Sequence, residues 1–144
     1  MSQTNADLVR QVEEAWAAND LSALDGLIAS DLVSHDALPG APGGLEGAKT
    51  AHRMSMASFP DRQMTIEDVI ADGDRVAVRT TVQGTNTGGL PWLGVPANGR
   101  RFQIESISVY RVAGGKVVEH WGQNDGIGLM MQLGAMSPPS GEGS

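Results

Sequence analysis

The segment from Lys116 to Gly134 constrains the fold more than any other part of the chain, because its periodicity changes within a few residues. Its first part has the period-two alternation of a β-strand, in which successive side chains point to opposite faces. One face carries Val117, Glu119, Trp121, Gln123 and Asp125, and the other carries Val118, His120 and Asn124. Helical spacing begins at Gly126. The segment therefore predicts a strand that leads directly into a C-terminal helix.

Asp125 stands at the junction of this predicted strand and helix, and two roles are open to it. Trp121 and Gln123 precede it on the same face of the strand, so an apolar ring and an amide would lie beside the carboxyl group. An apolar setting raises the pKa of a carboxyl group and strengthens the carboxylate as a base. Aspartate is also a favoured N-cap, and on spacing alone the cap is the commoner role.

Length and composition limit the classes of partner. A chain of 144 residues suits one domain with a sizeable core, which we expect over residues 1–136, followed by a disordered Ser-, Pro- and Gly-rich tail over 137–144. The 17 acidic and 10 basic residues give a formal charge of −7. That charge disfavours nucleic acid and anionic membrane surfaces as partners.

Cysteine and histidine usage makes a metal site unexpected. The sequence has no cysteine, and its three histidines lack the close spacing of a zinc site. No apolar run approaches the ~20 residues that a membrane-spanning helix needs. The polar N-terminal region has no signal-peptide pattern, so we expect a cytoplasmic protein.

Three helices are predicted before the strands. Leu8, Val12, Ala15 and Trp16 form an apolar stripe, which predicts a first helix capped by Thr4 or Asn5. A second stripe over residues 21–28 predicts another helix, and residues 45–59 predict a third after a Gly- and Pro-rich loop. Trp16 belongs either to the core or to a pocket wall. His35 and His52 are commonly solvated at such positions, although a role in a pocket stays open for each.

The remaining segments predict an antiparallel meander. Strands are expected over residues 64–70, 75–85 and 101–112. Phe102 and Ile104 have one parity and Ile107 and Val109 the other, which predicts a β-bulge that bends the strand around a cavity. Segregated helices and strands indicate an α+β fold, with helices on one side of a curved sheet and a conical pocket between them.

The loop over residues 87–100 is rich in Gly and Pro and contains Trp92, Leu93 and Val95. Apolar side chains on such a loop favour either a lid over a pocket or an oligomer contact.

Short motifs in a fixed order carry a family resemblance over about residues 5 to 136. The earlier motifs are Trp16 with Asn19-Asp20, His35-Asp36, and the residues 44–47, 59–61, 72–76 and 84–88. The strongest are Gly99-Arg100-Arg101-Phe102, Tyr110-Arg111, Gly115-Lys116, Glu119-His120-Trp121, Asp125 and Gln132-Leu133-Gly134. In these the chain resembles the SnoaL-like polyketide cyclases of the NTF2-like (ketosteroid-isomerase-like) superfamily.

The resemblance implies a cone-shaped α+β barrel, in which a curved antiparallel sheet wraps around N-terminal helices and leaves an internal pocket. It also implies a homodimer or homotetramer, and an intramolecular aldol condensation of a polyketide-like small molecule of the ester-cyclase type, without metal or organic cofactor. The family's acid/base aspartate falls on Asp125. Two departures stand out, because Ser106 and Ser108 replace a Gln and a His of the family, and Asn86 replaces a His in a GTHTG-like motif.

These considerations give a predicted site with Asp125 as the catalytic acid/base. The predicted substrate-binding residues are Trp16, His35, His52, Trp92, Ser106, Ser108, His120, Trp121 and Gln123. Two alternatives stay open, namely a cofactor-independent polyketide hydroxylase or isomerase of the same fold, and a non-catalytic small-molecule-binding module.

Overall fold

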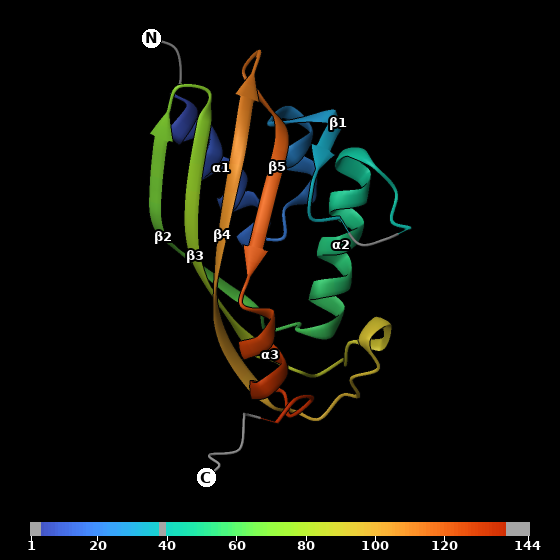
Figure 1. The fold of residues 1–144 in the computed structure, drawn as a ribbon. Coiled ribbons are helices and arrows are strands. Elements are labelled where there is room, and N and C mark those ends of the chain that lie inside the picture. Colours follow the sequence, from blue (N-terminus) through green and yellow to red (C-terminus); the bar gives the residue numbers. More distant parts are fainter. Residues whose placement is uncertain (1–3, 38–39, 138–144) are drawn as a thin grey trace.

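A curved five-stranded sheet with the order β1-β5-β4-β3-β2 forms one wall of the molecule (Figure 1). The computed structural model describes residues 4–37 and 40–137, so the predicted tail lies, except for Ser137, outside the described residues. The strands are β1 (Ile28–Ser34), β2 (Gln63–Asp72), β3 (Arg75–Thr85), β4 (Arg101–Ala113) and β5 (Lys116–Asn124). The order β2 to β5 is an antiparallel meander, and β1 joins the β5 edge in the parallel sense.

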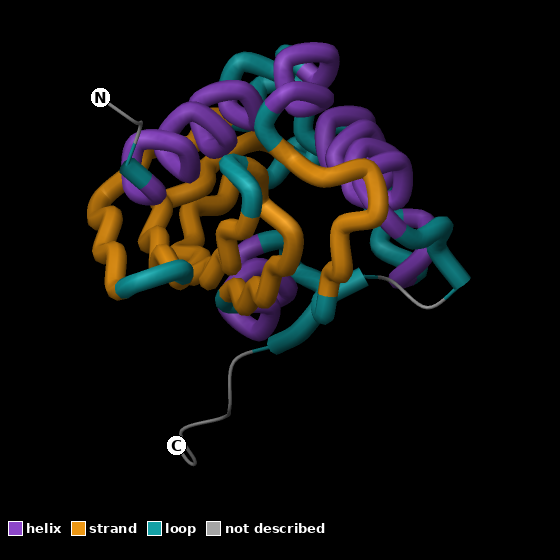
Figure 2. The backbone as a smooth tube through the Cα atoms, turned by 90° about the horizontal axis from the view of Figure 1, so that it is seen from above, coloured by secondary structure: helices purple, strands orange, loops and turns teal. Residues whose placement is uncertain are grey.

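Helices α1 (Asn5–Ala17) and α2 (Gly44–Ser58) lie on one side of this sheet, as the view from above in Figure 2 shows. The short α3 (Gly126–Gln132) follows β5 and lies beside β4, and there are two 3₁₀-turns, η1 (Leu21–Gly26) and η2 (Pro91–Leu93). This arrangement confirms the predicted α+β class and curved sheet. No helix in the described ranges has the length and apolarity needed to cross a membrane.

Helix α1 follows the sequence prediction closely. The Thr4 hydroxyl accepts a hydrogen bond from the Asp7 amide at 3.1 Å, which satisfies one of the free donors at a helix start. The apolar stripe of α1 is buried and packs against β2 and β3. Burying each Leu or Val side chain contributes about 1.5–3 kcal/mol, so this face fixes α1 against the sheet.

The second predicted helix is wrong in its latter half. Residues 21–26 form the 3₁₀-turn η1, and Ile28 begins β1. Leu24 and Ile28 are still buried, so the apolar stripe was real, but edge pairing with β5 provides the backbone hydrogen bonds of residues 28–34. This strand was not predicted, and it determines where the residues after it lie.

The predicted bulge near the middle of β4 is also wrong. The β3–β4 register runs without interruption from Arg75↔Arg111 to Thr85↔Arg101. Ile107 simply points outward and is 52% exposed. The irregularity lies instead between Arg111 and Val112, in the pairing with β5.

This register decides which side chains face inward. On β4 the inward positions include Ser106, Ser108 and Tyr110, which share the parity of the buried Phe102 and Ile104. On β5 the extra residue beside the bulge places both Val117 and His120 inward, whereas Glu119 and Trp121 face outward. The outer face therefore takes several residues that simple alternation had assigned to the pocket.

Candidate active site

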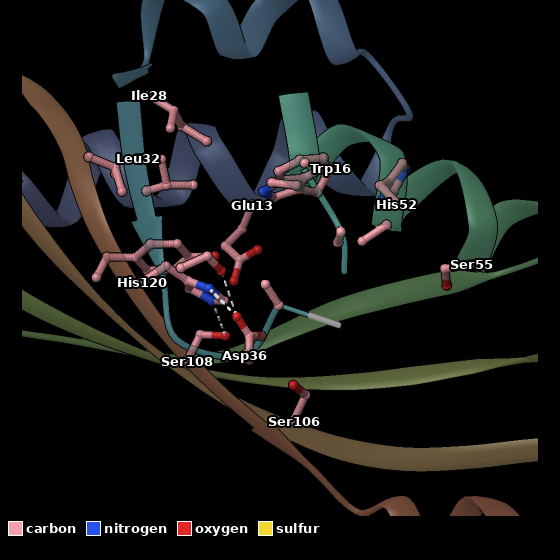
Figure 3. A pocket seen from close by; sticks show the side chains of 18 of the residues that line it. Glu13, Trp16, Ile28, Leu32, Asp36, His52, Ser55, Ser106, Ser108 and His120 are labelled. Atoms are coloured by element: carbon pink, nitrogen blue, oxygen red, sulfur yellow. Dashed lines mark hydrogen bonds and ion pairs between the residues drawn. The ribbon is translucent and has the colours of Figure 1, made fainter. Parts of the chain in front are cut away.

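A cavity of about 470 Å³ lies between the concave face of the sheet and helices α1 and α2 (Figure 3). Its volume is within the range of small-molecule sites, which are mostly apolar with a few polar groups. Apolar walls come from Trp16, Ile28, Leu32, Met64, Val82 and Val117. The principal polar groups are Glu13, Asp36, His52, Arg62, Ser106, Ser108, Tyr110 and His120.

His120 connects two polar side chains at one side of the cavity. Its Nδ1 lies 3.1 Å from Asp36 Oδ1, and its Nε2 lies 3.1 Å from Ser108 Oγ. A carboxylate can only accept, so the neutral ring that fits donates from Nδ1 to Asp36 and accepts the Ser108 hydroxyl at Nε2. This is the donor–acceptor order of a Ser–His–Asp arrangement, in which the aspartate orients the imidazole and stabilises its protonated form.

Asp36 reaches His120 because β1 ends two residues before it. The Ser34 hydroxyl donates to Asp36 Oδ1 at 2.7 Å, so the carboxylate is held from two sides. Burial acts to raise the pKa of Asp36, but the hydrogen bond and charge of His120 and the Ser34 hydroxyl outweigh it, and the pKa is lowered below 3.8. Asp36 is therefore a carboxylate at neutral pH.

Gly122 leaves room for this carboxylate. A Cβ added to Gly122 would lie 2.5 Å from Asp36 Oδ2 and 3.0 Å from His120 Cε1. Real Cβ atoms essentially never approach an oxygen that closely. The lack of a side chain on this inward position of β5 thus allows Asp36 to cross to His120.

A buried acid continues the polar wall toward helix α1. Glu13 is 5% exposed and lies beside Tyr110, which in turn lies beside Ser108. Burial raises the pKa of Glu13 despite the opposing effect of Tyr110. Burial and the neighbouring Glu13 also raise the pKa of Tyr110 well above its usual value, so its hydroxyl stays protonated.

His52 forms part of the opposite wall, beside Trp16. It is 8% exposed, its ring centroid lies 5.0 Å from that of Trp16, and its Nε2 lies 3.0 Å from Asn19 Oδ1. Burial, followed by repulsion from Arg62 and Arg53, lowers the pKa of His52 to about 4, so the ring is neutral at pH 7. Asn19 adopts a left-handed φ of 56°, a conformation that Asn tolerates better than most residues.

Five of the predicted site residues line the cavity and five do not. Those that line it are Trp16, His52, Ser106, Ser108 and His120. Those outside it are His35, Trp92, Trp121, Gln123 and Asp125.

His35 and Trp121 stack on the outer face of the sheet, with ring centroids 4.8 Å apart and planes 5° apart. His35 Nε2 also lies 2.6 Å from Glu119 Oε2. Gln123 is exposed, since the bulge in β5 places it with Trp121, and Trp92 is 39% exposed on the loop after β3. The prediction that these side chains face the pocket is therefore wrong.

Asp125 caps α3. Its carboxylate accepts a hydrogen bond from the Gly128 amide at 2.8 Å, and the residue is exposed. The expectation that its side chain turns into the cavity is wrong, whereas the cap predicted from spacing is present. Its carboxylate lacks the position that a base acting in the cavity needs.

Of the principal polar groups of the cavity, four were not predicted, namely Glu13, Asp36, Arg62 and Tyr110. Glu13 carried a signal, because it directly follows Val12 of the apolar stripe and an acid there is close to the buried face. Tyr110 carried another, because it shares the parity of Ser106 and Ser108. Asp36 depended on the unpredicted strand β1. Within residues 4–37 and 40–137, no group of three or more His, Cys, Asp or Glu is placed to hold a metal ion.

Comparisons with known proteins agree with this architecture. A family model described as SnoaL-like polyketide cyclase matches residues 6–133. Aklanonic acid methyl ester cyclase DnrD from Streptomyces peucetius is 30% identical over 138 residues, covering 94% of this chain and 94% of that protein. The crystal structure of IdmH from Streptomyces antibioticus is similar with a TM-score of 0.79 and 35% identity, covering 92% of this chain and 99% of that one.

AclR from Streptomyces galilaeus, provisionally described as a hydroxylase, is similar with a TM-score of 0.78 and 28% identity, covering 96% of this chain and 85% of that one. The fold inferred from the sequence motifs is thus confirmed by structural relatives.

Proposed function

Because the chain belongs to the SnoaL-like polyketide cyclase family, we propose that it closes a ring by intramolecular aldol condensation of a polyketide ester in the cavity. The observation that carries the proposal is the hydrogen-bonded series Ser108–His120–Asp36 on the cavity wall. It offers a neutral imidazole as base, with a carboxylate to stabilise the charge that the imidazole gains. The proton transfers of the reaction then need no cofactor.

The first step removes a proton from a carbon that an ester and a ketone acidify. Binding of substrate draws the Ser108 hydroxyl toward a substrate oxygen, which frees His120 Nε2 to accept that proton. Asp36 stabilises the resulting imidazolium through Nδ1. A positioned base of this kind contributes roughly 10²–10⁴-fold to the rate.

The second step forms the carbon–carbon bond. The carbanion attacks a ketone carbon of the same molecule, the carbonyl π bond becomes an alkoxide, and the imidazolium returns its proton to that oxygen. Enclosure in the cavity holds the two carbons together, which lowers the entropic part of the barrier. Ser108 lines the same wall, and its hydroxyl, once turned away from His120, can donate to the developing oxygen charge.

Turnover by three variants tests this assignment. With aklanonic acid methyl ester, the substrate named for DnrD, as the probe, His120→Gln and Asp36→Asn are expected to lower turnover by roughly 10²-fold or more. Asp125→Asn is the matched control, because an amide oxygen also caps a helix. Loss of turnover in Asp125→Asn, with activity retained in the other two, would return the base to Asp125.

Hydroxylation is the second candidate, because AclR shares this fold. The product mass separates the two reactions. Aldol ring closure leaves the mass of the substrate unchanged, whereas hydroxylation adds one oxygen atom. An unchanged mass together with a new ring in the NMR spectrum is the result that our proposal predicts.

A further inference from the structure

Arg62 is a cation in the cavity that the proposed reaction does not use. It lies between the end of α2 and the start of β2, directly after Phe59-Pro60-Asp61, and its side chain lines the cavity. The side chain is largely withdrawn from solvent, and burial lowers the pKa of Arg62 below its usual value. A guanidinium nevertheless stays charged in a protein. The cavity therefore contains a permanent positive charge.

No side chain in residues 4–37 and 40–137 forms a salt bridge or a hydrogen bond with the Arg62 guanidinium. Glu13 is near enough to favour the charge on Arg62, but burial favours the protonated form of Glu13. Asp36 is held by His120 and Ser34. Charges withdrawn from solvent are normally paired, so the position beside this partly buried guanidinium suits an anion from outside the chain.

A second titratable group near Arg62, His52, carries no negative charge. Arg62 lies close enough to His52 to help lower its pKa to about 4, after the larger effect of burial. His52 donates to Asn19 Oδ1 from Nε2 and is neutral at pH 7. In Figure 3 His52 lies at the side of the cavity opposite His120 and Asp36. The cavity thus contains the carboxylate of Asp36 beside His120 and a separate cation, Arg62, within reach of both Glu13 and His52.

We propose that Arg62 forms an anion subsite that binds a carboxylate of the substrate, remote from the carbon that reacts. The guanidinium fork matches a carboxylate in a bidentate manner, and charge attraction is strong where water is scarce. A substrate held in this way has its acidic carbon at the His120 side. The subsite deepens the proposed function and rests on it. Polyketides with a free carboxyl group in addition to the activating ester are expected to bind more tightly than aklanonic acid methyl ester, whose carboxyl group is esterified.

Binding of two matched probes tests the subsite without turnover. Anthraquinone-2-carboxylate and its methyl ester have the same flat ring system and differ in charge. Isothermal titration of the wild-type protein is expected to show at least about tenfold tighter binding of the acid than of the ester. Equal affinity for the two probes would overturn the subsite, and this comparison needs no variant.

Arginine variants assign the preference to one residue. Arg62→Met is expected to remove the preference for the acid while leaving ester binding unchanged, and Arg62→Lys should keep part of it. Arg53→Met is the matched control, because Arg53 is exposed on α2 and does not line the cavity. An acid preference that persists in Arg62→Met would assign it to another group and contradict the proposal.

The melting temperature of Arg62→Met measures, independently of ligand binding, whether Arg62 stabilises the fold. Removal of an unpaired buried charge does not lower stability, so the variant should melt no earlier than the wild type. A clearly lower melting temperature would show that Arg62 supports the fold and would contradict a site kept for a ligand. His120→Gln is expected to bind the acid like the wild type. If His120→Gln loses turnover while the wild-type protein binds the acid and the ester equally well, the subsite is refuted and the cyclase proposal stands.

Discussion

At the residue scale, the chemistry of the cavity depends on a contact between two segments that are far apart in the sequence. Asp36 follows β1, and His120 lies on β5, with Gly122 opening the space between them. The pKa of Asp36 is lowered because His120 and Ser34 outweigh the effect of burial. A charged carboxylate is thereby held at Nδ1 of His120, opposite the Nε2 atom that we propose as the proton acceptor.

Gly122→Ala tests the space that Asp36 occupies. The added methyl group must displace the carboxylate, because its Cβ would lie 2.5 Å from Asp36 Oδ2. We expect turnover to fall by roughly 10²-fold, the scale of an ångström-sized misplacement. Gly126→Ala is the control, since its Cβ would meet only Asn124 Oδ1 at 3.7 Å. If Gly122→Ala acts through Asp36, the double variant Gly122→Ala/Asp36→Ala should have the same turnover as Asp36→Ala alone. A double variant in which the two losses of turnover add would contradict that route.

Glu13 predicts a pH dependence of stability with a definite sign. Burial raises the pKa of Glu13 above its ordinary value of 4.5, so folding favours the protonated carboxyl. That contribution is complete below about pH 4.5 and is lost as the pH rises through the folded pKa. The facing groups Tyr110, His120 and Arg62 oppose the shift without reversing it.

The melting temperature of Glu13→Gln relative to wild type is therefore expected to rise between about pH 4 and about pH 8. Gln keeps the size of the side chain and cannot ionise. A difference that stays constant over this range would show that Glu13 ionises as readily in the folded protein as in the unfolded chain.

At the element scale, the short helix α3 shows how one residue can fit two roles in a sequence. Asp125 follows a strand and precedes a helix, and both a base and a cap fit that place in a sequence. The structure favours the cap, because the Gly128 amide has no partner in the first turn and Asp125 supplies one. Asp125→Ala is expected to lower the free energy of unfolding by about 0.5–2 kcal/mol, measured by urea denaturation.

The amide variant separates capping from charge. Asp125→Asn should keep most of the stability that Asp125→Ala loses, and both should keep turnover once folded. A stable Asp125→Asn protein without activity would show that the carboxylate takes part in the reaction.

The elements that sequence reasoning predicted are those whose pattern is local. The stripe of α1, the alternation of β3 and the stop at Phe59-Pro60 each depend on neighbouring residues and were found. Strand β1 exists because its backbone pairs with β5, which lies some distance along the chain. The bulge beside Val112 depends on two strands at once. Neither feature has a local signal, and both decide which residues reach the cavity.

At the scale of the whole molecule, the sheet and the helices enclose a site that contains a carboxylate and a separate cation. The residue types needed for it were visible in the sequence, since Trp16, His52, Ser106, Ser108 and His120 were all predicted as site residues and line the cavity. Their grouping with Asp36 and Arg62 follows only from the curvature and register of the sheet. The family resemblance predicted the fold, while our proposal of His120 as the base depends on the geometry.

The most direct test of the central claim is the exchange of the acidic α-hydrogen of aklanonic acid methyl ester for deuterium in D₂O, followed by NMR. Exchange reports proton abstraction alone, before any ring closes. We predict that the wild-type protein and Asp125→Asn accelerate the exchange. In His120→Gln and Asp36→Asn the exchange rate is expected to be lower than in the wild type by roughly 10²-fold or more. Exchange at the wild-type rate in His120→Gln would contradict the assignment of His120 as the base.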